Sequence, residues 1–427
     1  MRRPHILALT VLLLLAALLA PSCGAGAVLV PADAIRIGAV FPLAGDLGPL
    51  AAEERAGVEA AVWLVNADGG VDGRQVVLTA ADVETAAHAQ PAIDALRDQG
   101  VQAIIGTYSS ALSVPVSIAA AQDGLVYWEA GAVADQVTGR GLPMVFRVGA
   151  DGAQLGQSTA TFTAENLAPR LGVPASHLRV SLVTADDDYA HSVADSVRRT
   201  ATASGMSVVS ESIYSPYSTS PDFGAAIADI RAARPDILVL SSHIPDGVLF
   251  RRAFLAAGLH VKAFLGSTMA QCLPTFGEEL GPDAIGVFAS DRPGDGFDPA
   301  TLPAPAHALF DRFARAFRAE RGHAPTEEGI SGFAAAWPLL HDVLPAAARR
   351  DAGLAAGSIA ASARAVDLPA GTLVNGAGLR FAASGPRLGQ NLRAASVIWQ
   401  WQAVRSSVVV WPAEFATGTI AFVPLPR

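Results

Sequence analysis

The sequence predicts an α/β protein with two parallel, doubly wound sheets, and three observations support this prediction. Short apolar runs alternate with amphipathic helical stretches from residue 35 onward, and the same alternation starts again near residue 179. The chain has 427 residues, of which 51% are hydrophobic and 16% charged, a composition that excludes a disordered chain. Repeated strand–helix–strand units of this spacing imply parallel strands, and the length allows two or three domains.

The N-terminal segment has the pattern of a secretory signal peptide. Arg2 and Arg3 precede an apolar run from Ile6 to Ala20 that only Thr10 interrupts. A basic end followed by such a run is typical of exported proteins, and the run is short for a membrane span. We therefore expect residues 1–22 to be a signal peptide and residues 23–34 a tether. The mature chain is then periplasmic or at the cell surface.

Cys23 leaves two cleavage sites open. The residues before it are similar to a bacterial lipobox, in which the cysteine is lipidated and tethers the protein to the membrane. The match is partial, because Ala20 stands where a lipobox prefers leucine. The alternative is ordinary cleavage after Ala25 or Ala27. Cys272 is the second of the two cysteines, so we do not expect a structural disulfide.

The first run of alternating elements follows from periodicity. Val58, Ala61, Val62 and Val65 fall on one face of a helix, and the Gly- and Asp-rich segment after Asn66 has the composition of a turn. The expected strands are residues 35–40, 74–80, 102–105 and 125–128. The expected helices are residues 53–66, 86–99 and 111–122.

The second run has the same rhythm. Gly205 and Gly258 stand just past two of its helices, where a left-handed cap residue belongs. The expected strands are residues 179–184, 207–212, 237–241 and 263–265. The expected helices are residues 189–203, 223–232 and 246–257. We interpret residues 146–157, between the two runs, as a hinge.

The last third of the chain is less regular. Residues 293–305 are proline-rich and indicate a loop, and residues 306–321 and 332–349 favour two helices. Residues 397–410 are rich in β-forming side chains.

The sequence offers no catalytic, metal or cofactor site. It contains no His-Glu-x-x-His pair, no Walker loop and no complete dinucleotide fingerprint. The segment from Gly329 to Gly332 does not match a nucleophile elbow, and Asp186 to Asp188 do not have the spacing of a calcium loop. The net charge is −9 without a block of basic residues, which argues against nucleic acid as a partner.

The ends of the expected strands are the best candidates for a binding site. In open α/β sheets, ligands bind outside the carboxyl ends of the strands. Ser109 and Ser110 follow one strand and begin a helix, so their hydroxyls and N–H groups suit an anion or a carboxylate, with simple N-capping as the alternative. Further strand-end side chains that could converge on a small-molecule cleft are Trp128, Glu129, Tyr189, His243 and Thr268.

Several motifs in order resemble one family. They are Ile35 to Gly45, Asn66 to Arg74, Ala103 to Gly106 with the two serines, Val145 to Arg147, Asp188 to Ala190 and Trp411 to Gly418. Together they resemble the type I periplasmic binding proteins, and more closely the branched-chain amino acid (Leu/Ile/Val) binding family of ABC transporters. The resemblance covers nearly all of the chain after residue 34.

The resemblance implies two Rossmann-like lobes joined by three hinge strands. The first lobe is expected at residues 35–148 and the second at residues 149–285. Residues 286–350 are expected to return to the first lobe, and residues 351–427 to complete the second and form a C-terminal tail.

The resemblance also assigns ligand-binding roles. Ser110 falls on the family serine that binds the ligand's carboxylate, with Ser109 beside it, and Tyr189 falls on the tyrosine that lines the pocket from the second lobe. Leu50, His243 and Glu328 fall near positions that surround the ligand's side chain.

Two positions depart from the family pattern. Val133, next to Ala132, stands where the family has a threonine that contacts ammonium and carboxylate. Thr268 stands where the family has the glutamate that binds the ammonium. Glu129 could replace that acid. The identity of the ligand is therefore open among an amide, a small carboxylate and an apolar amino acid.

The function that the resemblance implies is capture of a small polar organic ligand by hinge closure and delivery to an ABC permease, by a monomer without a cofactor. A sensory binding protein of the same fold is the first alternative, and an exported enzyme is the second.

Overall fold

The computed structural model describes residues 31–216, 220–294 and 296–426. One compact unit begins at Ile35. The expected signal peptide and the lipidation site at Cys23 lie outside the described residues. Within the described ranges, no helix combines the length and the apolar character that crossing a membrane requires.

The first sheet is fully parallel, with strand order β2-β1-β3-β4-β5. Every residue of β3 and β4 is buried, as in the middle of a sheet that is covered on both faces. The strands are β1 (Ile35–Phe41), β2 (Val76–Asp82), β3 (Ala103–Gly106), β4 (Val126–Glu129) and β5 (Val145–Arg147). The helices that connect them are α2 (Gly48–Ala67), α3 (Ala89–Asp98) and α4 (Ser110–Gln122).

The second sheet has the order β12-β11-β10-β9-β8-β6-β7. It is parallel from β7 to β10, and β11 and β12 add an antiparallel hairpin at one edge. The strands are β6 (Arg179–Ala185), β7 (Ser207–Tyr214), β8 (Ile237–Ser241), β9 (Ala263–Ser267), β10 (Phe288–Asp291), β11 (Val397–Ala403) and β12 (Ser406–Trp411).

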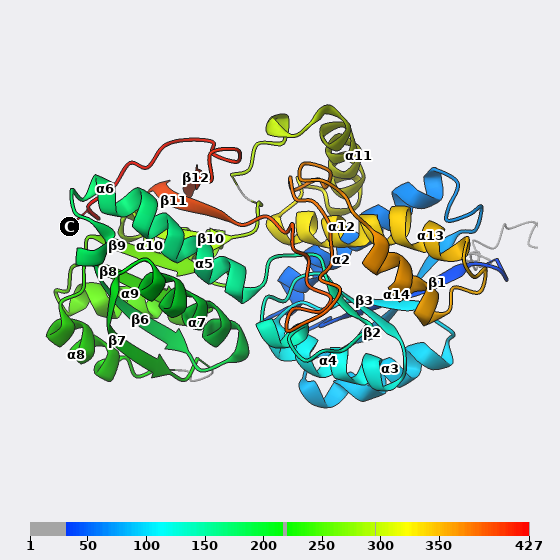
Figure 1. Ribbon diagram of the computed structural model, residues 1–427, viewed down its shortest axis with the longest axis horizontal. Helices are drawn as coiled ribbons and strands as arrows, with labels where there is room; N and C mark the ends of the chain where they lie inside the picture. The colour runs from blue at the N-terminus through cyan, green and yellow to red at the C-terminus, as the bar shows by residue number, and fades with distance from the viewer. Residues whose placement is uncertain (1–30, 217–219, 295, 427) are drawn as a thin grey trace, which may run out of the picture. The chain divides into compact units, whose positions relative to one another are not determined.

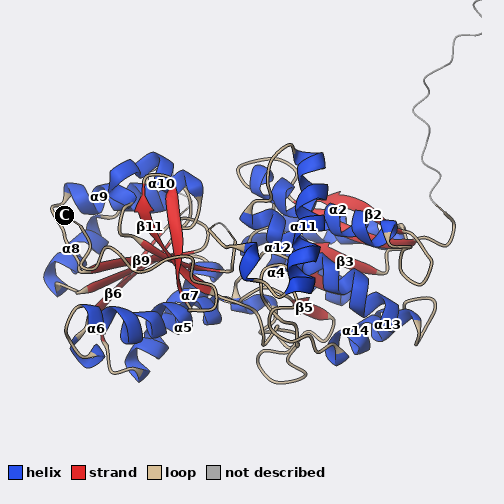
Figure 2. Ribbon diagram, turned by 90° about the horizontal axis from the view of Figure 1, so that it is seen from above, coloured by secondary structure: helices blue, strands red, loops and turns tan. Residues whose placement is uncertain are grey.

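Helices cover both faces of the second sheet, with α9 and α10 on one side and α5 and α6 on the other (Figure 2). These helices and their neighbours are α5 (Gly152–Phe162), α6 (Ala168–Arg170), α7 (Asp188–Ala203), α8 (Gly224–Ala233), α9 (Asp246–Ala256) and α10 (Pro274–Leu280). Gly205 and Gly258 follow α7 and α9 with φ of 82° and 65°, so both occupy the left-handed cap position that the sequence predicts.

The remaining helices pack with the first sheet. They are α11 (Ala304–Arg321), α12 (Glu327–Pro338), α13 (Leu344–Ala348) and α14 (Ala356–Ala365), and Figure 1 shows α12 beside α2. Phe313, Phe333 and Ile359 belong to the same buried cluster as Ile37 and Trp128. The chain thus passes between the two sheets after β5, after β10 and before β11, in agreement with three hinge connections.

The expected fold class is confirmed, but some details differ. Residues 146–157 hold the end of β5 and the start of α5 rather than a continuous hinge. The expected return at residue 286 comes too early, because β10 pairs with β9 in the second sheet. The boundary expected at residue 351 also comes too early, because α14 packs with the first sheet and the chain rejoins the second sheet only at Val397.

Candidate functional site: a cavity at the strand ends of both sheets

A cavity of about 820 Å³ is lined by loops that follow parallel strands of both sheets. From the first sheet it receives loops after β1, β2, β3 and β4, and from the second sheet loops after β6, β7, β8 and β9. Seven of the predicted site residues line it: Ser109, Ser110, Ala132, Val133, Tyr189, His243 and Thr268. The doubly wound topology brings them together, since the carboxyl ends of parallel strands meet at one edge of each sheet.

Ser109 and Ser110 form the start of α4 at this cavity. Ser109 is the N-cap, with a φ of 81°, a left-handed conformation that is costly for a serine and that the surrounding structure must hold. Its Oγ is buried and has no hydrogen-bond partner among the described residues. The Oγ of Ser110 accepts a hydrogen bond from the N–H of Ala134 at 3.0 Å, and its own proton is left for a further acceptor.

Tyr189, His243 and Thr268 form much of the opposite wall. The hydroxyl of Tyr189 bonds to the Oγ of Ser267 at 2.7 Å and donates to the carbonyl of Thr268, so its polar end is already engaged within the protein. Burial raises the pKa of Tyr189 well above its ordinary value. Its ring meets that of His243 edge to face, with centroids 5.2 Å apart, and presents an aromatic surface to the cavity.

The structure places Glu129 behind the cavity wall instead of in it. The fully buried carboxylate accepts hydrogen bonds from the N–H groups of Gly131 and Ala132 at 2.8 and 2.7 Å, and from the hydroxyls of Tyr127 and Ser113. Burial raises its pKa, and these donors oppose that rise. Glu129 therefore shapes the loop that lines the cavity and has no oxygen directed at a ligand.

Leu50 does not line the cavity. It lies in the first turn of α2 and is partly buried against apolar clusters that include Trp337 and Trp399. The cavity wall nearest to it in sequence is formed by Asp46 and Leu47.

Sequence reasoning named none of the acids that line the cavity as site residues, and the two least exposed of them are Asp187 and Asp246. Asp187 is the N-cap of α7, and one of its oxygens lies 2.5 Å from Nε2 of His243. Asp246 is the first residue of α9, and its Oδ2 accepts a hydrogen bond from the hydroxyl of Tyr214. Both follow strands that the sequence predicts correctly, so their positions just after these strands could have identified them as candidate site residues.

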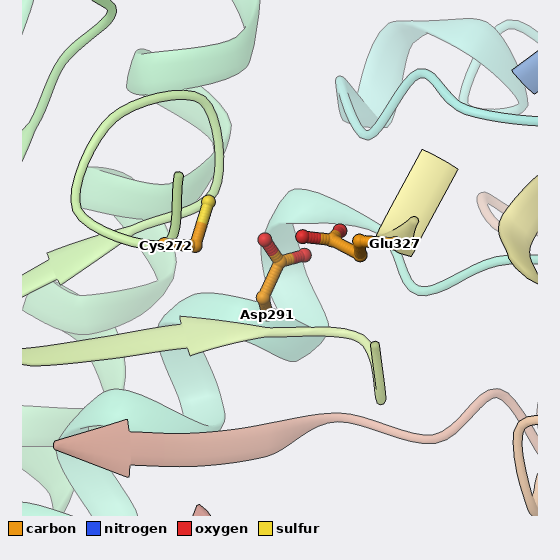
Figure 3. A group of neighbouring side chains, drawn as sticks. All are labelled: Cys272, Asp291 and Glu327. Carbon is orange, nitrogen blue, oxygen red and sulfur yellow. The ribbon is translucent and has the colours of Figure 1, made fainter. Parts of the chain in front are cut away.

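A second group of buried titratable side chains lies where the chain leaves the second sheet. Cys272, Asp291 and Glu327 have ligand-type atoms within 4.8 Å of one another, and the carboxyl groups of Asp291 and Glu327 face each other (Figure 3). Arg292 supplies positive charge here, since its Nε donates to Glu327 at 3.1 Å and its Nη1 to the carbonyl of Gly131 at 2.8 Å. We interpret this group as a structural feature of the point where the chain leaves the second sheet, in which the charge of Arg292 compensates the carboxylates of Asp291 and Glu327.

A second cavity of about 740 Å³ lies between α2 and α11, away from the strand ends. It is lined by alanines, by Trp63, which is 60% exposed, and by Arg312 and Arg315.

Two doubly wound α/β units whose strand ends share one cavity define a bilobal solute-binding fold. The pattern of the periplasmic binding protein family matches residues 34–398, and the chain belongs to that family. The predicted resemblance to periplasmic binding proteins is thereby confirmed, and relatives named for Leu/Ile/Val binding are similar to nearly the whole chain.

Individual proteins of known sequence or structure are similar to this chain along most of its length. The Leu/Ile/Val-binding protein homolog 8 of Brucella abortus (strain 2308) is 29% identical over 394 residues, covering 91% of this chain and 93% of that protein. The leucine binding protein LivK of Thermotoga maritima has a TM-score of 0.71 at 19% identity, covering 88% of this chain and 98% of that one. A solute binding protein of R. palustris in complex with benzoate has a TM-score of 0.67 at 19% identity, covering 91% and 100%. These two structures are similar in fold.

Proposed function

We propose that this protein is an exported solute-binding protein that captures a small polar organic solute in the strand-end cavity and delivers it to an ABC importer. The main support is the cavity itself, which receives side chains from both sheets and contains the Oγ of Ser109, an atom with no hydrogen-bond partner in the described part of the chain. A solute that contacts both walls favours the arrangement in which the walls are close, in proportion to its greater affinity for that arrangement. An importer can then recognise the loaded form.

The wall at the start of α4 is suited to a carboxylate or another anionic group. The first N–H groups of an α-helix have no carbonyl partner within the helix, and the helix dipole places partial positive charge there. Ser109 and Ser110 add hydroxyls at the same point. We therefore propose that these serines bind the carboxylate end of the solute.

The rest of the cavity differs from what a branched-chain amino acid needs. Val133 is apolar where the family threonine would bind, and Thr268 carries no charge. The names of the relatives support an amino acid as the solute, while the benzoate complex shows that similar folds host other carboxylates. We propose an amino acid or a comparable amide or carboxylate.

Binding can be tested by thermal unfolding of the purified protein against amino acids, amides, amines and small carboxylates. A solute that binds only the folded state adds about 2.7 kcal/mol of stability at 100 times its dissociation constant, and so raises the melting temperature. A reproducible shift with one class supports solute capture. No shift with any class, at concentrations up to the millimolar range, contradicts it.

We also propose export with membrane attachment through a lipid on Cys23. The apolar run from Ile6 to Ala20 supports export. Mass spectrometry of the membrane fraction should find a lipid-modified N-terminal Cys23, and Cys23→Ser should release the protein. An unmodified mature chain that begins after Ala25 or Ala27 would contradict the lipid anchor and leave export in place.

A further inference from the structure

The strand-end cavity is acidic. Five carboxylate side chains line it, those of Asp46, Glu84, Asp187, Asp188 and Asp246. His243 is the sole basic side chain among the described residues that line it, and neither a lysine nor an arginine is present there. Because field lines concentrate in a cleft with walls of low dielectric constant, an excess of one sign attracts solutes of the other.

Asp246 is the acid in this cavity with a buried carboxylate oxygen that no described residue hydrogen-bonds. Its side chain is buried, and its Oδ2 accepts hydrogen bonds from the hydroxyl of Tyr214 and from the N–H of His243, the latter at 3.3 Å. Its Oδ1 is also buried but receives no hydrogen bond from another described residue. Burying a carboxylate oxygen without a partner costs free energy, and a donor carried by a solute would recover it.

Asp187 lies on the same wall and shares a partner with Asp246. Its Oδ1 accepts from the N–H of Ala190 at 2.9 Å, and its Oδ2 lies 2.5 Å from Nε2 of His243, whose backbone N–H contacts Asp246. The side chain of Asp187 is 12% exposed. The two carboxylates are therefore linked through His243.

Helix dipoles reduce this negative charge but do not cancel it. The N-termini of α4, α7 and α9 are at the cavity, and each contributes about half a positive charge. Roughly one and a half positive charges from three helix ends stand against five carboxylates, of which Asp46, Glu84 and Asp188 are solvent-exposed, so the cavity keeps an excess of negative charge.

We propose that the cavity selects solutes with a net positive charge: a basic amino acid, or an amine of similar size. The cationic group binds Asp246 and Asp187, and a carboxylate, where the solute has one, binds at the start of α4. This assignment rests on the proposed solute capture and names its substrate class. It differs from the branched-chain amino acids and benzoate of the relatives.

Calorimetric titration of the purified protein with six solutes tests the charge preference. Arginine and lysine carry a cationic side chain, and agmatine has the guanidinium without the carboxylate. Leucine, isovaleramide and benzoate, none of which carries a net positive charge, are the comparison set. We expect at least tenfold tighter binding of the best basic solute than of leucine or benzoate, with an affinity that falls as salt is added. A comparison of the affinities for agmatine and arginine shows whether the solute's carboxylate contributes to binding.

Substitutions of the two acids test where the cationic group of the solute binds. Asp246→Asn should weaken binding of the basic solute at least tenfold, since the charge-assisted contact is lost. Asp187→Asn, which keeps the N-cap acceptor of α7, is the second variant if Asp246→Asn fails to fold. Asp186→Asn is the matched control, because Asp186 precedes α7 but is 67% exposed and does not line the cavity.

The outcomes separate the two proposals. Binding of leucine, isovaleramide or benzoate in preference to every basic solute overturns the charge preference and leaves solute capture intact. Tight binding of a basic solute that is unaffected by both Asp246→Asn and Asp187→Asn overturns the assignment to this wall. Failure of all six solutes to bind overturns the charge preference, and solute capture is then decided by the wider thermal-shift series.

Discussion

At the scale of single residues, the candidate site depends on two buried polar atoms on opposite walls of one cavity. Ser109 Oγ and Asp246 Oδ1 are both buried without a partner among the described residues. Both residues line the same cavity, so a solute bound there can supply a hydrogen-bond partner to each atom.

Ser109→Ala should weaken solute binding about tenfold and leave the protein as stable as before, since it removes a hydroxyl that has no internal bond. Calorimetric titration gives the first result and thermal unfolding without solute the second. Ser207→Ala, at the exposed start of β7, is the control. Unchanged affinity in Ser109→Ala would remove this hydroxyl from the binding site.

Glu129→Ala should lower the free energy of unfolding by about 3 kcal/mol, because the donors of Gly131, Ala132, Tyr127 and Ser113 lose one shared acceptor. Urea denaturation measures the change. Asp98→Ala, at a side chain that is 72% exposed, should shift stability by less than about 0.5 kcal/mol. A similarly small effect for Glu129→Ala would show that this hydrogen-bond network does not stabilise the folded protein.

Residue roles were harder to predict than residue positions. The sequence places Glu129 at a strand end, but which way it points depends on the N–H groups of the loop that follows. Asp246 stands at the beginning of a correctly predicted helix, yet its burial against Tyr214 requires β7 and β8 to be neighbours across β6. Such contacts are set by tertiary packing and have no local sequence signal.

At the scale of elements, the contact between α2 and α12 depends on glycine. A Cβ on Gly57 would lie 2.1 Å from the carbonyl oxygen of Gly329, and one on Gly332 would lie 1.9 Å from the carbonyl oxygen of Glu54. The two backbones therefore touch, and this close approach holds α12 and the acidic residues at its start against the first sheet.

Gly57→Ala should destabilise the protein by about 1–3 kcal/mol or more, as overpacked cores do. Gly357→Ala is a matched control in α14, where a Cβ meets nothing within 4 Å. The control should gain about 0.5–1 kcal/mol from the better helix propensity of alanine. Thermal and urea unfolding measure both variants, and equal effects in the two would contradict a backbone contact at Gly57.

The regular elements were predictable because their periodicity is strong. The strands and helices of both runs lie within a few residues of their expected bounds, as with residues 237–241 for β8. The short elements β5, β10 and α10 were not expected. Four buried residues such as Phe288–Asp291 carry no period, and only their pairing with β9 and β11 makes them a strand.

At the scale of the whole molecule, buried acids make stability depend on pH. Glu54 is fully buried with both carboxyl oxygens unpartnered among the described residues. Burial raises its pKa well above the ordinary 4.5, Arg292 opposes the rise, and Glu129 and Glu328 add to it. The folded state therefore keeps a proton that the unfolded state releases above about pH 4.5.

It follows that this group costs stability as pH rises from about 4.5 through its raised pKa. Glu54→Gln should make the fall in unfolding free energy between pH 5 and pH 9 shallower, by roughly 1.4 kcal/mol per pKa unit of the shift that it removes. Urea denaturation across this range is the measurement, with the exposed Glu211→Gln as the control. A slope that is unchanged in Glu54→Gln would contradict a protonated Glu54.

The central claim is that one solute contacts both walls of the strand-end cavity. Hydrogen exchange of the purified protein, with and without the solute that gives the largest thermal shift, tests it most directly. We predict slower exchange in residues 106–112 of the first wall and also in residues 185–191 and 241–248 of the second. Protection of one wall alone, or of residues 56–67 and 312–320 around the cavity between α2 and α11, would contradict it.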